Sequence, residues 1–507
     1  MSRHLPRLFV GLAVCLALAS CSKQAGSGRA LCADCNVVLI SMDTVRADHL
    51  GAYGYDVGTS PNVDRLAERA VVFERAVSQS AWTLPAHGSM MTGLYPGRLG
   101  VTHYPAKRRL PTGVPMLAEE FKKAGYATAG FTGGGFVARH FGFGRGFDIY
   151  STDGRRFEHN MDEAVSFLKS HTKRRFFMFL HGYNAHRPYF SLAADKKAVG
   201  LSTDGPIEQR GFCMRGRRER PDDLDRIIKY YDASIHHGDR QVGRFLDALT
   251  ELGLDDNTVV LITSDHGEEF FEHGNCDHVR FLYREVVDVP YILYVPGLTP
   301  EGHRVPGLVP ASISVARTLL DVAGVDHNMP GPSLAGILRG EDRGFGAVYS
   351  ETASVTGKLG SRGETVAMTT PRQKLVRYTQ EGAEEAYDLA RDPFELRVLP
   401  AGHEAYGRRK TLEAWHVAMS PLPKPTTRVA RAATPDKART PAQNRARAAA
   451  QRAARARANA AAARAGRTGK TAPPARPARP ADPADDAPEE LPEDLKEHLR
   501  SLGYLED

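Results

Sequence analysis

Residues 36–41 read Asn-Val-Val-Leu-Ile-Ser, an almost unbroken apolar run near the start of the chain. A strand that helices cover on both faces shows such a run, whereas a strand with one wet face alternates polar and apolar residues. Further apolar runs follow at residues 126–131, 176–180 and 258–262, and segments of helical character separate them. The alternation predicts an α/β fold with a mostly parallel sheet sandwiched by helices.

Polar residues stand where three of these strands are expected to end. Asp43 follows the first run, His181 and His186 follow the third, and Asp265 with His266 follows the fourth. Each residue taken alone is well explained as a capping Asp or a core His. The carboxyl ends of parallel strands, however, meet at one edge of a sheet, where α/β proteins bind ligands. Carboxylates with an imidazole at such an edge are typical ligands of a divalent metal ion in a hydrolytic site, which predicts Asp43, Asp265 and His266 as metal ligands.

Thr83 stands two residues before Pro85, and a helical run follows. Proline is favoured in the first turn of a helix, so the Thr83 hydroxyl is expected at a helix N-terminus. Backbone N–H groups and the helix dipole hold anions at that position. A plain N-cap is the alternative role of this residue.

Composition and charge exclude several classes of protein. Of the 507 residues, 42% are hydrophobic and 25% are charged, as in average globular proteins, which excludes wholesale disorder, collagen-like repeats and a polytopic membrane protein. The net charge is +7, but residues 428–479 contain 14 basic residues and one acidic residue, so the rest of the chain is mildly acidic. Nucleic-acid binding by the body of the protein therefore has no support.

The N-terminus predicts an exported lipoprotein. Residues 1–20 have the form of a signal peptide whose apolar run is too short to span a bilayer, and they end in Leu-Ala-Ser before Cys21, which resembles a bacterial lipobox. We expect Cys21 to carry the lipid; a plain cleaved signal is the alternative. Ser22 follows, which by the sorting rule of enteric bacteria favours the outer membrane, facing the periplasm. In an exported protein the remaining cysteines favour disulfides, with their connectivity left open.

Shifts in composition divide the chain into segments. After a polar tether at 21–35, the catalytic domain is expected over 36–330, followed at 331–425 by short strand-like pieces that predict a small antiparallel subdomain. Residues 426–486 are rich in Ala, Arg and Pro and cannot bury a core, which predicts disorder. Residues 487–507 regain Leu at helical spacing, which predicts a terminal helix.

With these motifs in order, the chain resembles the sulfatase family of the alkaline phosphatase superfamily. The motifs that carry the resemblance lie at residues 36–54, 60–66, 83–96, 181–189, 263–274, 282–296 and 387–393. The resemblance implies the fold of that superfamily and a metal-dependent hydrolase of sulfuric or phosphoric esters.

The chain departs from the sulfatase pattern at three positions. Sulfatases carry Cys or Ser, later oxidised to formylglycine, where this chain has Thr83; they carry Arg at His87 and often a second Asp at Thr44. Threonine is the nucleophile in phosphate-transferring branches of the superfamily, so Thr83 is expected to act unmodified as the nucleophile and to be a fourth ligand of the metal ion, with Asp43, Asp265 and His266. With one carboxylate fewer and an imidazole present, the divalent metal ion (Mn, Zn or Ca) is expected to be Mn²⁺ or Zn²⁺ rather than Ca²⁺.

His186 and His278 complete the candidate catalytic residues. His278 lies where sulfatases commonly hold a Lys on the ester oxygens, and we expect both histidines to contact those oxygens. Protonation of the leaving group, a second metal bound with His181, and an ordinary place in a loop are the alternatives. His87 is expected to assist proton transfer or to bind an oxygen.

The sequence thus predicts a lipid-anchored, metal-dependent hydrolase of sulfate or phosphate/phosphonate esters in which Thr83 forms a covalent intermediate. A phospho-headgroup transferase differs only in its acceptor. A non-catalytic, sulfatase-like lipoprotein that binds anionic envelope polymers is the alternative from another class.

Overall fold

The computed structural model describes residues 30–104, 108–152, 156–202, 221–298, 303–354 and 363–419, together with Glu493, Lys496 and Glu497. The chain divides into two units, residues 1–422 with 490–507 and residues 423–489. The predicted signal peptide, Cys21, the predicted disordered segment and most of the predicted terminal helix lie outside the described residues. Within the described residues, no helix is both long enough and apolar enough to cross a membrane.

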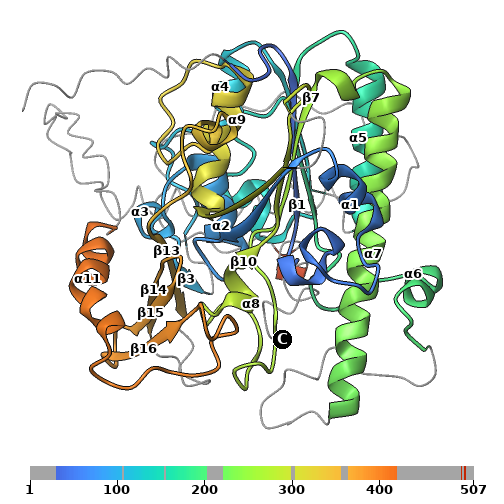
Figure 1. Cartoon of the computed structure of the whole chain (residues 1–507). Helices are drawn as coiled ribbons and strands as arrows, with labels where there is room; N and C mark the ends of the chain where they lie inside the picture. Colours follow the sequence, from blue (N-terminus) through green and yellow to red (C-terminus); the bar gives the residue numbers. More distant parts are fainter. Residues whose placement is uncertain are drawn as a thin grey trace, which may run out of the picture. The chain divides into compact units, whose positions relative to one another are not determined.

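The apolar run at residues 36–41 forms β1 (Asn36–Met42), which lies inside a nine-stranded sheet (Figure 1). β1 pairs in parallel with β6 (Phe176–Gly182) on one side and with β7 (Thr258–Thr263) on the other. β4 (Ala127–Phe131) pairs in parallel with β6, and β5 (Ile149–Ser151) with β4. The predicted mostly parallel sheet is confirmed.

Beyond β7 the sheet contains antiparallel pairs that the sequence did not predict. β11 (Tyr291–Tyr294) runs antiparallel to both β7 and β2 (Val71–Val77). β10 (Asp288–Val289) is antiparallel to β2, while β12 (His303–Pro310) is parallel to it.

Side chains of β1 alternate between two hydrophobic cores, one on each face of the sheet. Val37 and Leu39 belong to the first core, and Val38 and Ile40 to the second. The first core includes residues of α2 (Thr83–Thr92), α4 (Leu117–Lys123) and α9 (Val315–Ala323). The second includes residues of α1 (Pro61–Ala67), α5 (Phe157–Ser170) and α7 (Pro221–Glu251). Figure 1 shows the two helix groups on opposite sides of the sheet, which explains the unbroken apolar run of β1.

The predicted antiparallel subdomain forms a second sheet. Its strands are β13 (Val348–Ser354), β14 (Glu364–Thr369), β15 (Gln373–Tyr378) and β16 (Ala383–Asp388), each antiparallel to the next. α11 (Arg409–Ala418) buries Leu412 against this sheet. β3 (His103–Tyr104), from far earlier in the chain, adds to β13 in parallel, so the sheet is built from both predicted domains.

The remaining elements are short. They are α3 (Pro96–Leu99), α6 (Ala193–Ala198), α8 (Arg284–Val287), α10 (Ala335–Leu338) and the hairpin of β8 (Glu269–Phe270) with β9 (Cys276–Asp277). Cys32 and Cys35 form a disulfide directly before β1, and Cys276 is also disulfide-bonded. The expected oxidised cysteines are therefore present at these positions.

Candidate active site

The predicted metal ligands meet at the carboxyl edge of the central strands. Asp43 follows β1 directly, and Asp265 and His266 follow β7. All these side chains are fully buried, and their ligand atoms lie close enough together to hold one metal ion. Thr44 N donates a hydrogen bond of 3.2 Å to Asp265 Oδ1, which joins the two strand ends.

Two buried carboxylate oxygens at this edge have no hydrogen-bond partner among the described residues: Asp43 Oδ1 and Asp265 Oδ2. Burial and the neighbouring Asp265 carboxylate raise the pKa of Asp43 well above its usual range. His266 Nδ1 donates to Gly267 O (2.9 Å), which leaves the Nε2 lone pair to act as a ligand. Burial lowers the pKa of His266 to about 4, so its imidazole is neutral, the form that binds metals. Two buried carboxylate oxygens without hydrogen-bond partners, beside a neutral imidazole, fit a divalent cation, whose charge would favour the ionised form of Asp43.

Thr83 is the first residue of α2, as the sequence predicted. The N-cap residue of this helix is Trp82, without a side-chain capping hydrogen bond. The Thr83 hydroxyl instead lies 3.4 Å from Asp43 Oδ2 and 3.5 Å from His266 Nε2. The helix start therefore presents this hydroxyl to the metal-ligand cluster rather than capping its own backbone.

His181, at the end of β6, orients Asp43. Its Nδ1 accepts a hydrogen bond from Gly133 N (3.4 Å), so the ring proton is on Nε2, which donates to Asp43 Oδ2 (3.1 Å). A ring nitrogen that donates a hydrogen bond cannot simultaneously ligate a metal. His181 is thus an orienting partner of Asp43 in this arrangement.

His278 lies next to the cluster, with its ring centroid 4.4 Å from that of His266. Its Nδ1 is 3.2 Å from Glu268 Oε1 and 2.9 Å from Asp277 Oδ1. Burial by itself lowers the pKa of His278, but the carboxylates of Asp277 and Glu268 outweigh it and raise the pKa to about 10. His278 is therefore a buried cation beside His266, and its expected contact with ester oxygens stays a prediction.

The backbone around His278 is held in an unusual conformation. Asp277 and Val279, on either side, have φ of 80° and 86°. A β-branched residue such as Val279 avoids the left-handed region, which costs about 1–3 kcal/mol. Val279 N donates to Ala81 O (2.7 Å), two residues before Thr83. This hydrogen bond joins the loop that carries His278 to the segment that directly precedes Thr83.

His186 lies beside His278, with ring centroids 5.1 Å apart. The Nδ1 of His186 donates a hydrogen bond to Arg187 O (2.6 Å), so Nε2 lies on the side of the ring away from this carbonyl oxygen. Burial and the neighbouring His278 lower the pKa of His186 well below its usual range. The neighbouring Arg187 forms an ion pair of 2.6 Å with Asp277, which anchors this loop to the loop that carries His278.

His87 lies one turn after Thr83 on α2 and is fully buried. Its Nδ1 donates to Thr83 O (3.0 Å) and is 3.4 Å from Asp265 Oδ2, while its Nε2 is 2.9 Å from Ser41 Oγ. Burial, partly offset by Asp265, lowers the pKa of His87. Both ring nitrogens of His87 thus contact protein atoms. The proton transfer or oxygen contact expected of His87 stays a prediction.

Strand β13 of the second sheet holds both active-site loops. Glu351 N donates to Gln79 O and Ser80 Oγ donates to Glu351 O, each at 2.9 Å. Thr352 Oγ1 donates to Val279 O at 2.5 Å. The C-terminal sheet therefore bonds directly to the loop before Thr83 and to the residue after His278.

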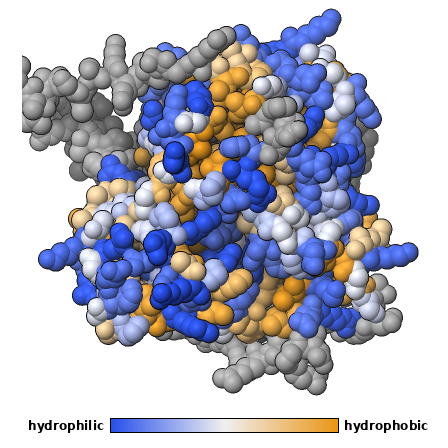
Figure 2. Space-filling view, viewed as in Figure 1, coloured by the Kyte–Doolittle hydropathy of each residue, from blue (hydrophilic) through white to orange (hydrophobic). Residues whose placement is uncertain are grey.

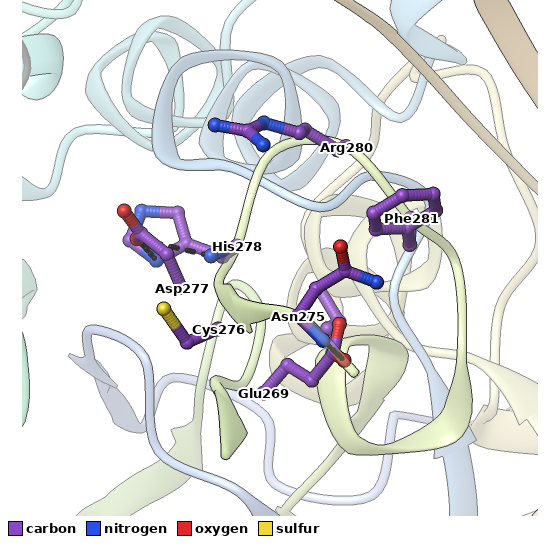
Figure 3. Close-up of a pocket in the computed structure, with 8 residues that line it drawn as sticks. Glu269, Asn275, Cys276, Asp277, His278, Arg280 and Phe281 are labelled. Carbon is purple, nitrogen blue, oxygen red and sulfur yellow. Dashed lines mark hydrogen bonds and ion pairs between the residues drawn. The ribbon is translucent and has the colours of Figure 1, made fainter. Parts of the chain in front are cut away.

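A small pocket of about 10 Å³, which holds little more than one water molecule, lies in the loop after β8 (Figure 3). Its lining residues are Glu269, Asn275, Cys276, Asp277, His278, Arg280, Phe281 and Val286. In Figure 3 the side chains of Asp277 and His278 extend to the opposite side of the loop from those of Asn275 and Phe281. Because His278 faces His266, we place the chemistry at the strand ends and not in the hollow of this loop.

The structure brings together Asp43, Thr83, Asp265 and His266, and it places His87, His186 and His278 around them. Sequence reasoning missed the partners of these histidines: Ser41, Glu268 and Asp277. Glu268 and Asp277 were visible only as acidic neighbours of His266 and His278 in sequence. Ser41 ends the apolar run at residues 36–41, and nothing in that run indicates a partner for its side chain.

Comparisons with known proteins show the family of this chain. A family model described as Sulfatase matches residues 35–325, and one described as N-sulphoglucosamine sulphohydrolase, C-terminal, matches residues 271–414. The first match covers more than half of the chain. The second includes β9 and strands β13 to β16 of the C-terminal sheet.

Individual relatives have modest sequence identity. The chain is 26% identical over 417 residues to an endo-4-O-sulfatase of Bacteroides thetaiotaomicron, which covers 67% of this chain and 81% of the relative. It is 26% identical to a Delta 4,5-hexuronate-2-O-sulfatase of the same organism, over 77% of this chain and 87% of the relative. A phosphonate monoester hydrolase of Agrobacterium radiobacter has a similar fold, with a TM-score of 0.64 and 21% identity over 76% of this chain and 95% of that one.

Proposed function

The chain belongs to the sulfatase family of ester hydrolases, and we propose that it uses unmodified Thr83 as the nucleophile on phosphate or phosphonate esters, with sulfate esters as poorer substrates. The observation that carries this proposal is the position of the Thr83 hydroxyl, 3.4 Å from Asp43 Oδ2 and 3.5 Å from His266 Nε2. A hydroxyl at a helix start, beside carboxylates and imidazoles, is arranged as an activated nucleophile.

A divalent metal ion fits the side chains of Asp43, Asp265 and His266, whose mixed oxygen and nitrogen donors suit Mn²⁺ or Zn²⁺. When bound, such an ion lowers the pKa of the Thr83 hydroxyl and polarises a non-bridging oxygen of the ester. His181 keeps Asp43 oriented through its hydrogen bond to Oδ2.

The proposed first step is attack by Thr83. Thr83 Oγ forms a bond to the phosphorus atom, and its proton passes to Asp43 Oδ2. The bond from phosphorus to the leaving-group oxygen breaks, and that oxygen takes a proton from the His278 imidazolium. Glu268 and Asp277 hold His278 in its protonated form for this role.

The proposed second step is hydrolysis of the covalent intermediate, which restores the protonation state of each side chain. Water attacks the phosphorus atom and gives a proton to His278, while the bond to Thr83 Oγ breaks. Thr83 then recovers its proton from Asp43. His186, buried beside His278, is proposed to contact the ester oxygens.

Phosphorus esters are favoured because of the nucleophile. A hydrated aldehyde expels sulfate from its own intermediate, whereas a threonine sulfate ester has to be attacked by water. Phosphoryl groups on an alcohol are resolved when a metal ion and histidines position that water. The fold similarity to a phosphonate monoester hydrolase is compatible with this choice, although at 21% identity it concerns the fold alone.

The test is steady-state kinetics on matched aryl phosphate, aryl phosphonate and aryl sulfate, with Mn²⁺, Zn²⁺ and Ca²⁺ in turn. The intact mass of the peptide that contains Thr83 is measured in parallel. We expect an unmodified threonine and a higher kcat/KM on the phosphorus esters. A sulfate preference with unmodified Thr83 would contradict the chemical argument, and no turnover of any ester would favour the non-catalytic, polymer-binding alternative. Transfer to an added alcohol in place of water would identify a transferase.

We further propose that the protein is anchored by lipid at Cys21 to the bacterial outer membrane, facing the periplasm. The Leu-Ala-Ser-Cys sequence at the end of a short apolar run supports this. Mass spectrometry of the mature N-terminus tests it: a diacylated Cys21 is expected, and an unmodified one would overturn the proposal. The substitution Cys21→Ser should release the enzyme from the membrane fraction.

A further inference from the structure

His87 is surrounded by protein atoms on both sides of its ring. It lies on α2 four residues after Thr83, and its neighbours Ser41 and Asp265 come from the ends of β1 and β7. The exposed fraction is 0% for Ser41, Thr83, His87 and Asp265. The ring nitrogens of His87 and the hydroxyl of Ser41 therefore need partners within the protein.

The acceptors around the ring determine where its hydrogen lies. Nδ1 faces the carbonyl oxygen of Thr83 at 3.0 Å and Asp265 Oδ2 at 3.4 Å, and neither oxygen can donate. The hydrogen is therefore on Nδ1. Nε2 faces Ser41 Oγ at 2.9 Å, and this is the one hydrogen bond of the Ser41 hydroxyl within the described part of the chain. Ser41 is satisfied only if it donates to Nε2, so Nε2 has no hydrogen of its own.

We propose that Ser41 and His87 are positioning residues, in which Ser41 keeps the ring hydrogen of His87 on Nδ1, and Nδ1–H fixes the first turn of α2 through its hydrogen bond to Thr83 O, beside Asp265. The proposal rests on the proposed role of Thr83 as nucleophile and deepens it. It assigns His87 to alignment of the Thr83 hydroxyl with the metal ligands, in place of the proton transfer that the sequence suggested.

The chemistry of the arrangement supports alignment. Thr83 O and Thr83 Oγ belong to one residue, so an N–H that fixes the carbonyl also restricts the orientation of the side chain. The same N–H lies 3.4 Å from Asp265 Oδ2, an oxygen without a hydrogen-bond partner among the described residues that His266 Nε2 also approaches, to 3.3 Å. Partners of this kind around a metal ligand contribute about 10- to 100-fold to metal affinity or activity.

Two conservative substitutions separate alignment from proton transfer. In His87→Asn the amide nitrogen takes the place of Nδ1 and can still donate to Thr83 O. In His87→Gln the amide group takes the place of Nε2 and the contact to Thr83 O is lost. We expect His87→Asn to keep kcat within about tenfold of the parent, and His87→Gln to lose about 100-fold in kcat with KM little changed.

Ser41→Ala tests the other end of the arrangement, with Ser234→Ala as its matched control. Ser234 is also fully buried and donates to one backbone carbonyl, that of Tyr231 at 2.7 Å, so the control measures the cost of deleting a buried hydroxyl elsewhere. We expect Ser41→Ala to weaken binding of Mn²⁺ about tenfold in a chelator competition and to lower kcat, while Ser234→Ala changes neither.

A direct readout of the hydrogen position does not depend on turnover. Long-range ¹H–¹⁵N correlation spectra of histidine-labelled protein distinguish the two nitrogens, and His87→Asn assigns the signal. We expect hydrogen on Nδ1 in the parent. Hydrogen on Nε2 would overturn the proposal, as would equal losses in His87→Asn and His87→Gln together with loss of a limb of the pH profile. If the parent turns over no ester, the proposed function fails, whereas the tautomer and the Mn²⁺ affinities still decide this inference.

Discussion

Glu268 Oε1 lies 3.2 Å from His278 Nδ1, and both side chains are buried. The pKa of His278 is raised to about 10 although burial acts in the opposite direction. This buried pair makes the charge of His278 depend on a side chain that lies outside the metal cluster.

Glu268→Gln should therefore move the alkaline limb of the activity profile. The protonated form of His278 is lost as the pH rises through about 10, and with one carboxylate fewer this loss should occur about one pH unit lower. Because the pKa of His278 is higher in the folded than in the unfolded state, its carboxylate partners also increase the free energy of unfolding. This contribution is complete below the unfolded pKa of histidine and is lost as the pH rises through about 10. The measurement is kcat/KM between pH 7 and 11. Glu74→Gln, which alters a surface pair with Arg304, is the control and should leave the limb in place.

Removal of the metal should abolish turnover without unfolding the chain. If Asp43, Asp265 and His266 share an ion, the pure protein should contain about one divalent ion per chain that a chelator removes. Asp265→Ala should lose the ion and the activity, while Asp326→Ala, an exposed acid elsewhere, should lose neither. Elemental analysis and circular dichroism decide the matter. A full metal content in Asp265→Ala would show that the ligand assignment is wrong.

Substitutions of Thr83 test the covalent step. Thr83→Ala should lower kcat by several orders of magnitude, because the atom that attacks phosphorus is gone. Thr83→Ser keeps the hydroxyl at the start of α2 and should retain a substantial fraction of the rate. Rapid-quench trapping of labelled phosphate on the protein should succeed in the parent and fail in Thr83→Ala. Equal rates in the parent and in Thr83→Ala would exclude Thr83 as the nucleophile.

Thr44→Asp should shift the metal preference towards Ca²⁺. Thr44 is fully buried next to Asp43, its hydroxyl has no hydrogen-bond partner among the described residues, and its φ is 59°. Asp tolerates that backbone conformation better than a β-branched residue and adds a hard oxygen ligand. We expect Ca²⁺ affinity, measured by competition with Mn²⁺, to rise at least about tenfold, with Thr44→Ser as the control. An unchanged ratio of affinities would show that position 44 does not reach the ion.

The features that the sequence predicted correctly are those that depend on local sequence patterns. The apolar run of β1 predicts a strand with two dry faces, and Asp43 follows it at the edge where ligands bind. Thr83 was placed at a helix start because Pro85 follows it. These inferences need only neighbours in the chain, which is why they were correct.

The parts that the sequence did not predict depend on contacts between distant segments. Nothing in the run of β1 distinguishes Ser41 as a partner of His87, because a small polar residue at a strand end is common. The pairing of β3 with β13 joins short segments separated by more than two hundred residues, and neither has a periodicity that indicates a partner. The roles of the histidines depend on which atoms surround each ring, and spacing carries no such information.

The hydrogen bonds from β13 to Gln79 and Val279 have a consequence for how this enzyme can be altered by evolution or by engineering. A gene shortened before residue 348 would still encode Asp43, Thr83, Asp265 and His266, yet the loops of Gln79 and Val279 would lose the strand that bonds to both of them. Exchange of modules between relatives should therefore succeed only when the break falls after the C-terminal sheet. We expect the two sheets to be exchangeable only together, and changes of specificity to be tolerated best in loops that β13 does not touch.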